Sequence, residues 1–285
     1  MTLIAILLAL LVERFASHYR DAGLYQTRGG PLIWLRTRLP SARLWHSLLW
    51  ITLLVLLPTA LIALLSIFID NNLLQLPYDA LILFLCLGPR DLADDIHRLI
   101  AAREAGDEDT VRRLTAALKQ GPVPETDARS LLGVLFIQSH ERLFGTLIWF
   151  VVGGPAGAVF YRLASRLPLV FASDDGTTAI FVNRLHAAAA WLPARFTAIL
   201  YAIVGSADDA LNAWRELPAN QSWIARTWTL LAEVPSAALN LEIDGAKLVP
   251  ARLELALEEV LRMRRRALLV LLAIFALYTA GAWLA

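Results

Sequence analysis

One apolar stretch, residues 144–168, constrains the fold of this chain more than any other. Its sequence is FGTLIWFVVGGPAGAVFYRLASRLP, close to membrane length, and the motif GGPAG interrupts it near the centre. In a helix, glycine costs about 1 kcal/mol relative to alanine and proline about 3 kcal/mol. Non-helical backbone survives inside a membrane only where protein or a water-filled cavity satisfies its polar groups. The motif therefore predicts a broken helix that forms either a ligand site or a close helix contact.

The composition is that of an integral membrane protein. Of its 285 residues, 58% are hydrophobic, and they gather in blocks rather than spreading evenly. Such a chain is too apolar for a soluble domain. The formal net charge is only +1, so the chain lacks the basic surface of a nucleic-acid-binding protein. We therefore expect an all-α, polytopic helical membrane protein that contacts the lipid bilayer and not nucleic acid.

The apolar blocks predict up to six spans within one integral membrane domain, residues 1–285. Positively charged loops favour the cytoplasmic side, and the loop after the first span contains five arginines against one acid. Whether the fourth and fifth blocks cross the bilayer or re-enter from one side stays open, and Pro193 is expected to begin a new helix. The expected spans are 1–19, 47–69, 73–88, 144–163, 182–204 and 267–284, and the expected cytoplasmic segments are 20–46, 89–142 and 205–266.

The polar segment after the third span has the periodicity of two helices. Apolar residues recur at helical spacing over 92–100 and again over 111–118. Gly106 is a typical helix stop, and Asp107 or Asp109 is placed to cap the second helix. The segment therefore predicts a cytoplasmic helical hairpin whose apolar stripe packs on the membrane core.

Glycines and arginines supply the candidate ligand site. Successive backbone N–H groups in a glycine-rich turn, followed by a helix N-terminus, attract anions. Arginine holds a phosphate or carboxylate through two hydrogen bonds, and arginines near membrane depth tend to face a polar cavity, for which Arg90 is a further candidate. The alternative is a kink for close helix packing, with Arg162 extending to the interface. The candidate ligand residues are Gly153, Gly154, Gly157, Arg162, Arg184, Arg195, Glu141 and Arg142.

Other polar residues have simpler interpretations. Glu141 and Arg142 pair with each other or with the Glu13-Arg14 doublet, and an interfacial salt bridge is favoured over a ligand site. His140 is expected to be solvated. The acid pairs 94–95 and 208–209 have the ligands that Mg²⁺ prefers, but solvated helix faces and caps are favoured. No catalytic or metal-binding residue is assigned, and the cofactor is unknown, with ATP and Mg²⁺ as the candidate.

Two motifs indicate a family. GGPAGAVFYRL (153–163) followed by LPARFTA (192–198) resembles the adenosylcobinamide-phosphate synthase family of cobalamin biosynthesis, whose members carry G-x-P-G-A-x-x-Y-R/K and later D-D-x-x-N-x-x-P-A-R-x-T-A. Within it the chain is most similar to the AmpE branch, because of its length, its N-terminal LLxLLVER, its YQTRGGP loop and its HERLFGTLIWF segment.

The chain also departs from the synthesising members. Their Asn-Thr-Leu-Asp-Ser stretch corresponds here to ASRLP (164–168), and their Asp-Asp-x-x-Asn is replaced by LHAAAA (185–190). Joining cobyric acid to an aminopropanol phosphate needs carboxylates to organise ATP and Mg²⁺. The comparison with that family therefore implies that anion binding is retained and ligation is lost.

The resemblance implies an inner-membrane regulatory protein of the AmpE type in a Gram-negative bacterium. Such a protein acts in β-lactamase induction, antibiotic resistance and cell-wall sensing, with an anionic, nucleotide-like ligand at the broken helix and a regulatory protein partner. The alternative is a divergent membrane-bound, ATP-dependent amide ligase resembling adenosylcobinamide-phosphate synthase. A transporter with a discontinuous helix ranks last, because no inverted repeat is visible.

Overall fold

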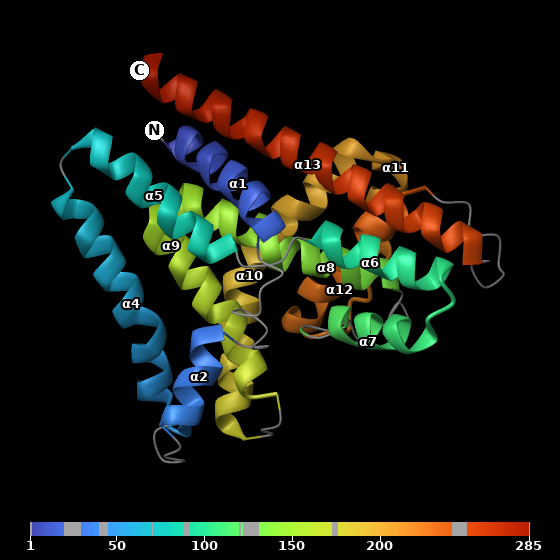
Figure 1. Ribbon diagram of the computed structural model, residues 1–285, viewed down its shortest axis with the longest axis horizontal. Coiled ribbons are helices and arrows are strands. Elements are labelled where there is room, and N and C mark those ends of the chain that lie inside the picture. Colours follow the sequence, from blue (N-terminus) through green and yellow to red (C-terminus); the bar gives the residue numbers. More distant parts are fainter. Residues whose placement is uncertain are drawn as a thin grey trace. The chain divides into compact units, whose positions relative to one another are not determined.

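The computed structural model describes residues 2–19, 30–39, 45–69, 71–87, 92–119, 121, 131–172, 176–240 and 250–284. Within these ranges every regular element is a helix, as the all-α expectation requires (Figure 1). Arg20, Arg28, Arg43 and Arg90 lie outside the described residues. The helices are α1 (Thr2–Tyr19), α2 (Gly30–Arg38), α4 (Leu48–Phe68), α5 (Asn72–Leu87), α6 (Leu92–Glu104), α7 (Glu108–Leu118), α8 (Leu131–Ser139), η1 (His140–Phe144), α9 (Gly145–Val170), α10 (Thr177–Val204), α11 (Ala207–Glu216), α12 (Trp223–Ala238) and α13 (Pro250–Leu284).

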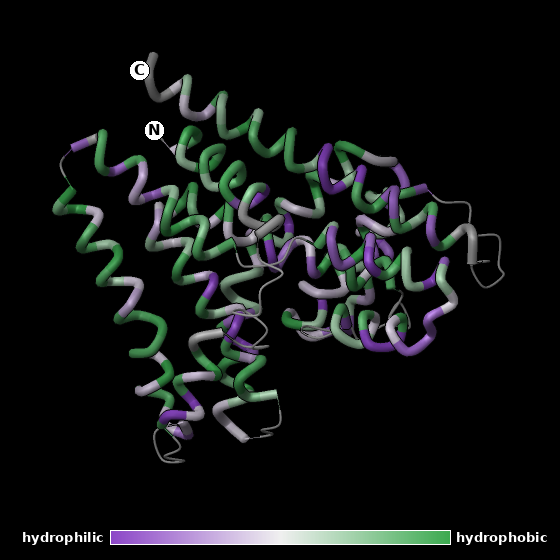
Figure 2. The backbone as a smooth tube through the Cα atoms, viewed as in Figure 1, coloured by the Kyte–Doolittle hydropathy of each residue, from purple (hydrophilic) through white to green (hydrophobic). Residues whose placement is uncertain are grey.

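Four helical stretches of the described chain are long and apolar enough to cross a membrane, by length and composition alone. They contain α4, α5 with α6, α8 with η1 and α9, and α10. Figure 2 shows hydrophobic residues along nearly all of α4 and hydrophilic residues gathered on α7. In α4 only Ile51 and Val55 are buried. A helix that is apolar on all sides and exposed on most of them is typical of one that contacts lipid.

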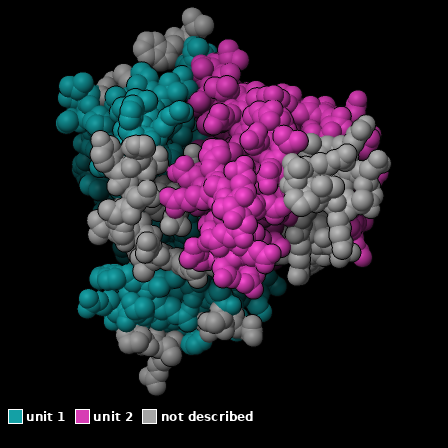
Figure 3. Space-filling view, turned by 45° about the vertical axis from the view of Figure 1, so that its right-hand side comes forward, with its two compact units in different colours: residues 1–89, 145–190, 279–285 teal, residues 90–144, 191–278 magenta. Residues whose placement is uncertain are grey.

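The chain forms two compact units, which are coloured separately in Figure 3. Unit 1 comprises residues 1–89, 145–190 and 279–285, and unit 2 comprises residues 90–144 and 191–278. In unit 1, α9 packs against α4 and α5, and α1 packs against α5. In unit 2, α12 packs against both α8 and α11. A single membrane domain over the whole chain stays a prediction.

The helix α9 reverses direction inside the GGPAG motif, where two residues have non-helical backbone angles. A Cβ atom on Gly157 would lie 2.2 Å from the carbonyl oxygen of Trp149, and one on Gly145 would lie 2.3 Å from the ring of Tyr161. In a straight helix, with a rise of about 1.5 Å per residue, Gly145 and Tyr161 would be about 24 Å apart. The two halves of α9 therefore pack antiparallel to each other around the motif.

The helix α10 runs without interruption from Thr177 to Val204, so the expectation that Pro193 begins a new helix is wrong. A proline removes the N–H group that would bond the carbonyl four residues earlier, which here is that of Ala189. The indole N–H of Trp149 donates to this carbonyl at 2.8 Å. A donor from α9 thus replaces the missing hydrogen bond, and α10 continues.

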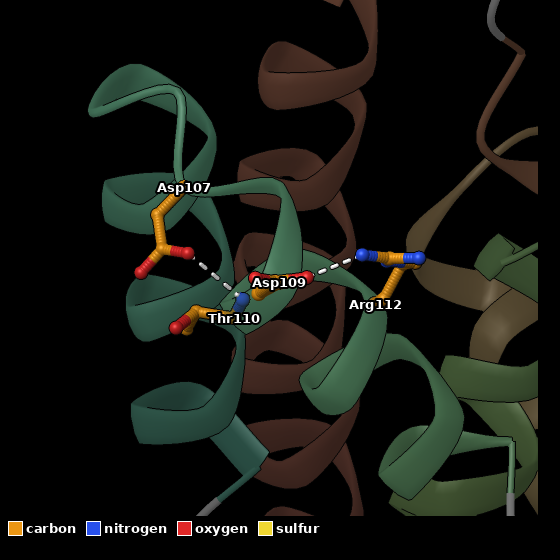
Figure 4. Close-up of polar contacts among 4 residues, drawn as sticks. All are labelled: Asp107, Asp109, Thr110 and Arg112. Atoms are coloured by element: carbon orange, nitrogen blue, oxygen red, sulfur yellow. Dashed lines mark hydrogen bonds and ion pairs between the residues drawn. The ribbon is translucent and has the colours of Figure 1, made fainter.

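The helices α6 and α7 form the predicted hairpin. Gly106 has a left-handed φ of 69° at the turn, and Asp107 caps α7 by accepting a hydrogen bond from the Thr110 N–H at 3.0 Å (Figure 4). Hydrogen bonds from the Thr110 side chain and backbone lower the pKa of the Asp107 carboxyl. Asp109 pairs with Arg112 on the exposed side of α7 (Figure 4). The predicted stop and cap are confirmed, and the cytoplasmic location stays a prediction.

Candidate ligand site

The turn of α9 has open space beside its two glycines. Around Gly153 and Gly154, no heavy atom of the described structure beyond the chain's immediate neighbours lies within 4 Å of where a Cβ would stand. Gly154 has φ 59° and ψ −153°, a conformation that only glycine adopts readily. Pro155 opens the second half of α9, where its missing N–H costs nothing. The N–H groups of the following turn have no partner within the helix, so the turn has the geometry that attracts anions.

The other candidate residues of unit 1 differ in their surroundings. Gly157 is buried against Trp149, which gives it a role in helix packing. Arg162 is half-buried two helical turns beyond Pro155. Arg184 is exposed on α10. The structure therefore places Arg162 on the same half-helix as the turn, and Arg184 in the same unit.

Arg195 belongs to unit 2. Its guanidinium lies 3.9 Å from the centroid of the Trp191 ring and donates to the Trp191 carbonyl at 2.7 Å. Arg226 of α12 lies near enough for the two positive charges to repel. Sequence reasoning missed Arg226, because it stands alone in its helix with no motif around it. Since Arg195 and the turn belong to different units, the convergence of the arginines on one pocket stays a prediction.

The π-helical turn η1 holds Glu141 and Arg142, and Arg142 is ion-paired. Its Nη1 lies 2.7 Å from Oδ2 of Asp95 on α6, and its Nε donates to Oε1 of Gln138 at 3.2 Å. The expectation that Asp95 lies on a solvated face is wrong: this residue is buried, and the charge of Arg142 compensates it. Glu141 is half-buried. Arg142 thus forms a salt bridge, but with Asp95, a partner 47 residues away that the favoured interpretation did not name; an interfacial location of this pair stays a prediction.

His140 is fully buried, so the expectation that it is solvated is wrong. Its Nδ1 lies 2.9 Å from the hydroxyl of Thr197, and that hydroxyl donates to the Pro193 carbonyl at 2.9 Å. Because Thr197 has one hydroxyl proton, the His140 Nδ1 must carry the proton of their shared bond. Nearby in sequence, Ser139 accepts a hydrogen bond from the Tyr201 hydroxyl at 2.9 Å. These bonds join η1 and α8 to α10, and residue spacing gave no sign of them.

The remaining acids behave as helix-terminal residues. Asp208 and Asp209 occupy the first turn of α11, and Asp208 is exposed, as a solvated face requires; the N-cap, however, is Ser206 rather than either acid. In the part of the chain that the structure describes, no three His, Cys, Asp or Glu side chains are grouped so that they could hold a metal ion. Mg²⁺ is often held by one or two carboxylates together with substrate phosphates.

These features define a class: a helical membrane protein with several candidate spans, one of which reverses at a double-glycine turn. The family model described as "Regulatory signalling modulator protein AmpE" matches residues 1–282. The chain belongs to the AmpE family.

Similarity to cobalamin biosynthesis proteins is more distant. The chain is 29% identical over 150 residues to the cobalamin biosynthesis protein CobD of Chromobacterium violaceum, a match that covers 50% of this chain and 48% of that protein. It is 28% identical over 144 residues to CobD of Stutzerimonas stutzeri, with 48% of each chain covered. The chain thus spans about half the length of the curated relatives it matches. No solved structure matches it.

Proposed function

We propose that this protein is a signalling modulator of the bacterial inner membrane that binds an anionic, nucleotide-like ligand at the turn of α9. Through that ligand it would report the state of the cell wall to the control of β-lactamase expression. Membership of the AmpE family supports the regulatory role. The single observation that carries the ligand site is the double-glycine turn, at which Gly154 has a left-handed backbone and open space around it.

The physical chemistry of this turn favours an anion. The first turn of the second half of α9 carries about half a unit of positive charge from the helix dipole. At membrane depth, unsatisfied N–H groups cost several kcal/mol each unless protein, water or a ligand pairs with them. In this proposal the two antiparallel halves of α9 enter and leave the bilayer from one side. The ligand then reaches the turn through a polar cavity.

The turn of α9 is connected through the chain to the ion pair of η1, which gives ligand binding a route to the rest of the protein. The first half of α9 continues back into η1, where Arg142 is ion-paired with Asp95 of α6. A ligand that binds one arrangement of the turn better than another shifts the equilibrium between the two by its differential affinity. We propose that this shift changes how the segment 89–142 docks and which regulatory protein partner it binds.

The test is ligand-dependent thermal stabilisation of the purified full chain in detergent. The compounds are ATP with Mg²⁺, nucleotide-linked cell-wall intermediates and cobinamide precursors. We expect one anionic class to raise the melting temperature, and Arg162→Ala to reduce that rise. Arg215→Ala, which removes an exposed arginine at the end of α11, is the matched control and should retain it.

Two results contradict the proposal: no compound in the panel stabilises the protein, or Arg162→Ala and Arg215→Ala respond to the ligand alike. The second result would assign the stabilisation to a nonspecific charge effect. Either would leave the turn of α9 with a packing role only.

The similarity to CobD supports one alternative, a divergent ATP-dependent amide ligase. Against it, Asp95 is already committed to Arg142, which leaves fewer carboxylates to organise a metal. Turnover of ATP in the presence of cobyric acid and an amino alcohol phosphate would establish the ligase. Stabilisation by the same ligands without turnover would support the regulatory role.

A further inference from the structure

The short helix α2 and the start of α4 form a cap of arginine and tryptophan side chains at one end of unit 1. The Nε1 of Trp45 donates to the carbonyl of Leu39 at 2.7 Å, which fastens the end of α2 beside the start of α4. The Trp45 ring also contacts Phe171, just after α9, with centroids 6.0 Å apart. These contacts fix where the arginines of α2 stand.

The two arginines of the last turn of α2 have different surroundings. Arg36 donates to the Val170 carbonyl, and its guanidinium lies 5.1 Å from the centroid of the Phe171 ring. It is therefore part of the packing between α2 and α9. Arg38 is exposed, and its guanidinium lies over the ring of Trp34 with its carbon 5.7 Å from the centroid. The Trp34 side chain is itself 57% exposed.

Arg38 has no counter-charge in the part of the chain that the structure describes. The described residues 30–39 and 45–69 contain no acidic residue, and within the described chain Arg38 is in no ion pair. Arg38 is in the last turn of α2, where the helix carries only about half a unit of negative charge, so a net positive charge remains there. An anionic group is the complement of this surface.

The start of α4 exposes apolar side chains that suit contact with lipid. In α4, Leu48 is 41% exposed and Leu49 is 70% exposed, and only 11% of the membrane-length window of this helix is buried. Tryptophan is enriched at the level of lipid headgroups, and basic residues near that level attract anionic lipids. An occupant must therefore offer an anion beside Arg38 and a hydrocarbon chain along the start of α4.

We propose that Arg38 and Trp34 form a binding site for the phosphate of an anionic phospholipid, in the leaflet where α4 begins. The lipid phosphate accepts hydrogen bonds from Arg38, whose guanidinium Trp34 holds in place by a cation–π contact. The acyl chains lie along Leu49 and the exposed face of α4. This inference goes beyond the proposed ligand site in α9 and does not depend on it.

Native mass spectrometry of the full chain tests the site. The protein is equilibrated with equal amounts of phosphatidylglycerol and phosphatidylcholine of identical acyl chains, and the ratio of the two bound lipids is measured. We expect phosphatidylglycerol to dominate, and Arg38→Gln to reduce the ratio about fivefold, the effect of one basic residue at a membrane surface. Arg215→Gln, at an exposed arginine of α11, is matched in charge and should leave the ratio unchanged.

Two further arms separate a lipid site from other causes. Trp34→Leu retains the charge of Arg38 and an apolar side chain at position 34. It should lower the ratio of phosphatidylglycerol to phosphatidylcholine, because Arg38 loses the ring that holds its guanidinium in place. Millimolar inorganic phosphate should not displace phosphatidylglycerol. An unchanged ratio in Arg38→Gln, an equal loss in Arg215→Gln, or displacement by free phosphate would each overturn the proposal. Because these variants lie outside α9, their results are independent of the ligand screen.

Discussion

The indole N–H of Trp149 donates a hydrogen bond to the backbone carbonyl of Ala189, the carbonyl that Pro193 deprives of its usual donor. We expect Trp149→Phe to lower the free energy of unfolding by about 1–3 kcal/mol, because it leaves a carbonyl unpaired. Pro193→Ala restores the helical N–H, so the double variant should regain most of the loss. Thermal unfolding in detergent measures this. Additive losses in the double variant would contradict the assignment.

The backbone of Gly154 gives a second prediction. Its φ of 59° with ψ −153° lies in a region almost restricted to glycine, whereas Gly153 has an ordinary φ of −126°. Both sites have open space for a methyl group. We therefore expect Gly154→Ala to cost about 1–3 kcal/mol of stability, through backbone strain alone. Gly153→Ala is the matched control and should cost clearly less. Equal melting temperatures would show that the turn rearranges freely.

The ion pair between Arg142 and Asp95 gives a third prediction. Asp95→Asn leaves the Arg142 charge mostly buried without its counter-charge, which we expect to destabilise unit 2 by about 3 kcal/mol. The equivalent change in the exposed pair, Asp109→Asn beside Arg112, should have little effect. Comparing the two unfolding curves checks this. Equal losses of stability in Asp95→Asn and Asp109→Asn would mean that the pair of Arg142 and Asp95 is effectively solvated.

The cap of α7 gives a prediction on pH. The folded state lowers the pKa of Asp107, so its stabilisation is present above the ordinary aspartate pKa and is lost as pH falls through the lowered value. We expect Asp107→Ala to speed amide exchange in α7 at neutral pH. This difference from the native chain should shrink in acid. Asp107→Asn, which caps without a charge, should protect α7 at both pH values. Hydrogen–deuterium exchange read by mass spectrometry resolves the three proteins.

Sequence reasoning succeeded where a local cost or preference decides the structure. The break in α9 follows from the cost of Gly153, Gly154 and Pro155 in a helix, and the cap of α7 follows from the residue types at Gly106 and Asp107. These effects act within a few residues of the chain. They are therefore visible before the fold is known.

Sequence reasoning failed where a partner from another helix decides. Pro193 does not end α10, because Trp149 supplies the missing donor from 40 residues before Ala189. His140 is buried because Thr197 satisfies its Nδ1, and Asp95 is buried because Arg142 neutralises it. For the candidate site, the sequence identified the turn, but the grouping of arginines around it depends on the arrangement of the two units.

The reversal of α9 has a consequence for the topology of the chain. By length and composition, residues 131–170 form one candidate membrane span of 40 residues. In the proposed arrangement, in which both halves of α9 enter and leave the bilayer from one side, this segment adds an even number of passages to the path of the chain. Whether the other helices together cross the bilayer an odd or an even number of times then decides on which side the C-terminus lies. On this proposal, two glycines in mid-chain set the orientation of everything that follows them.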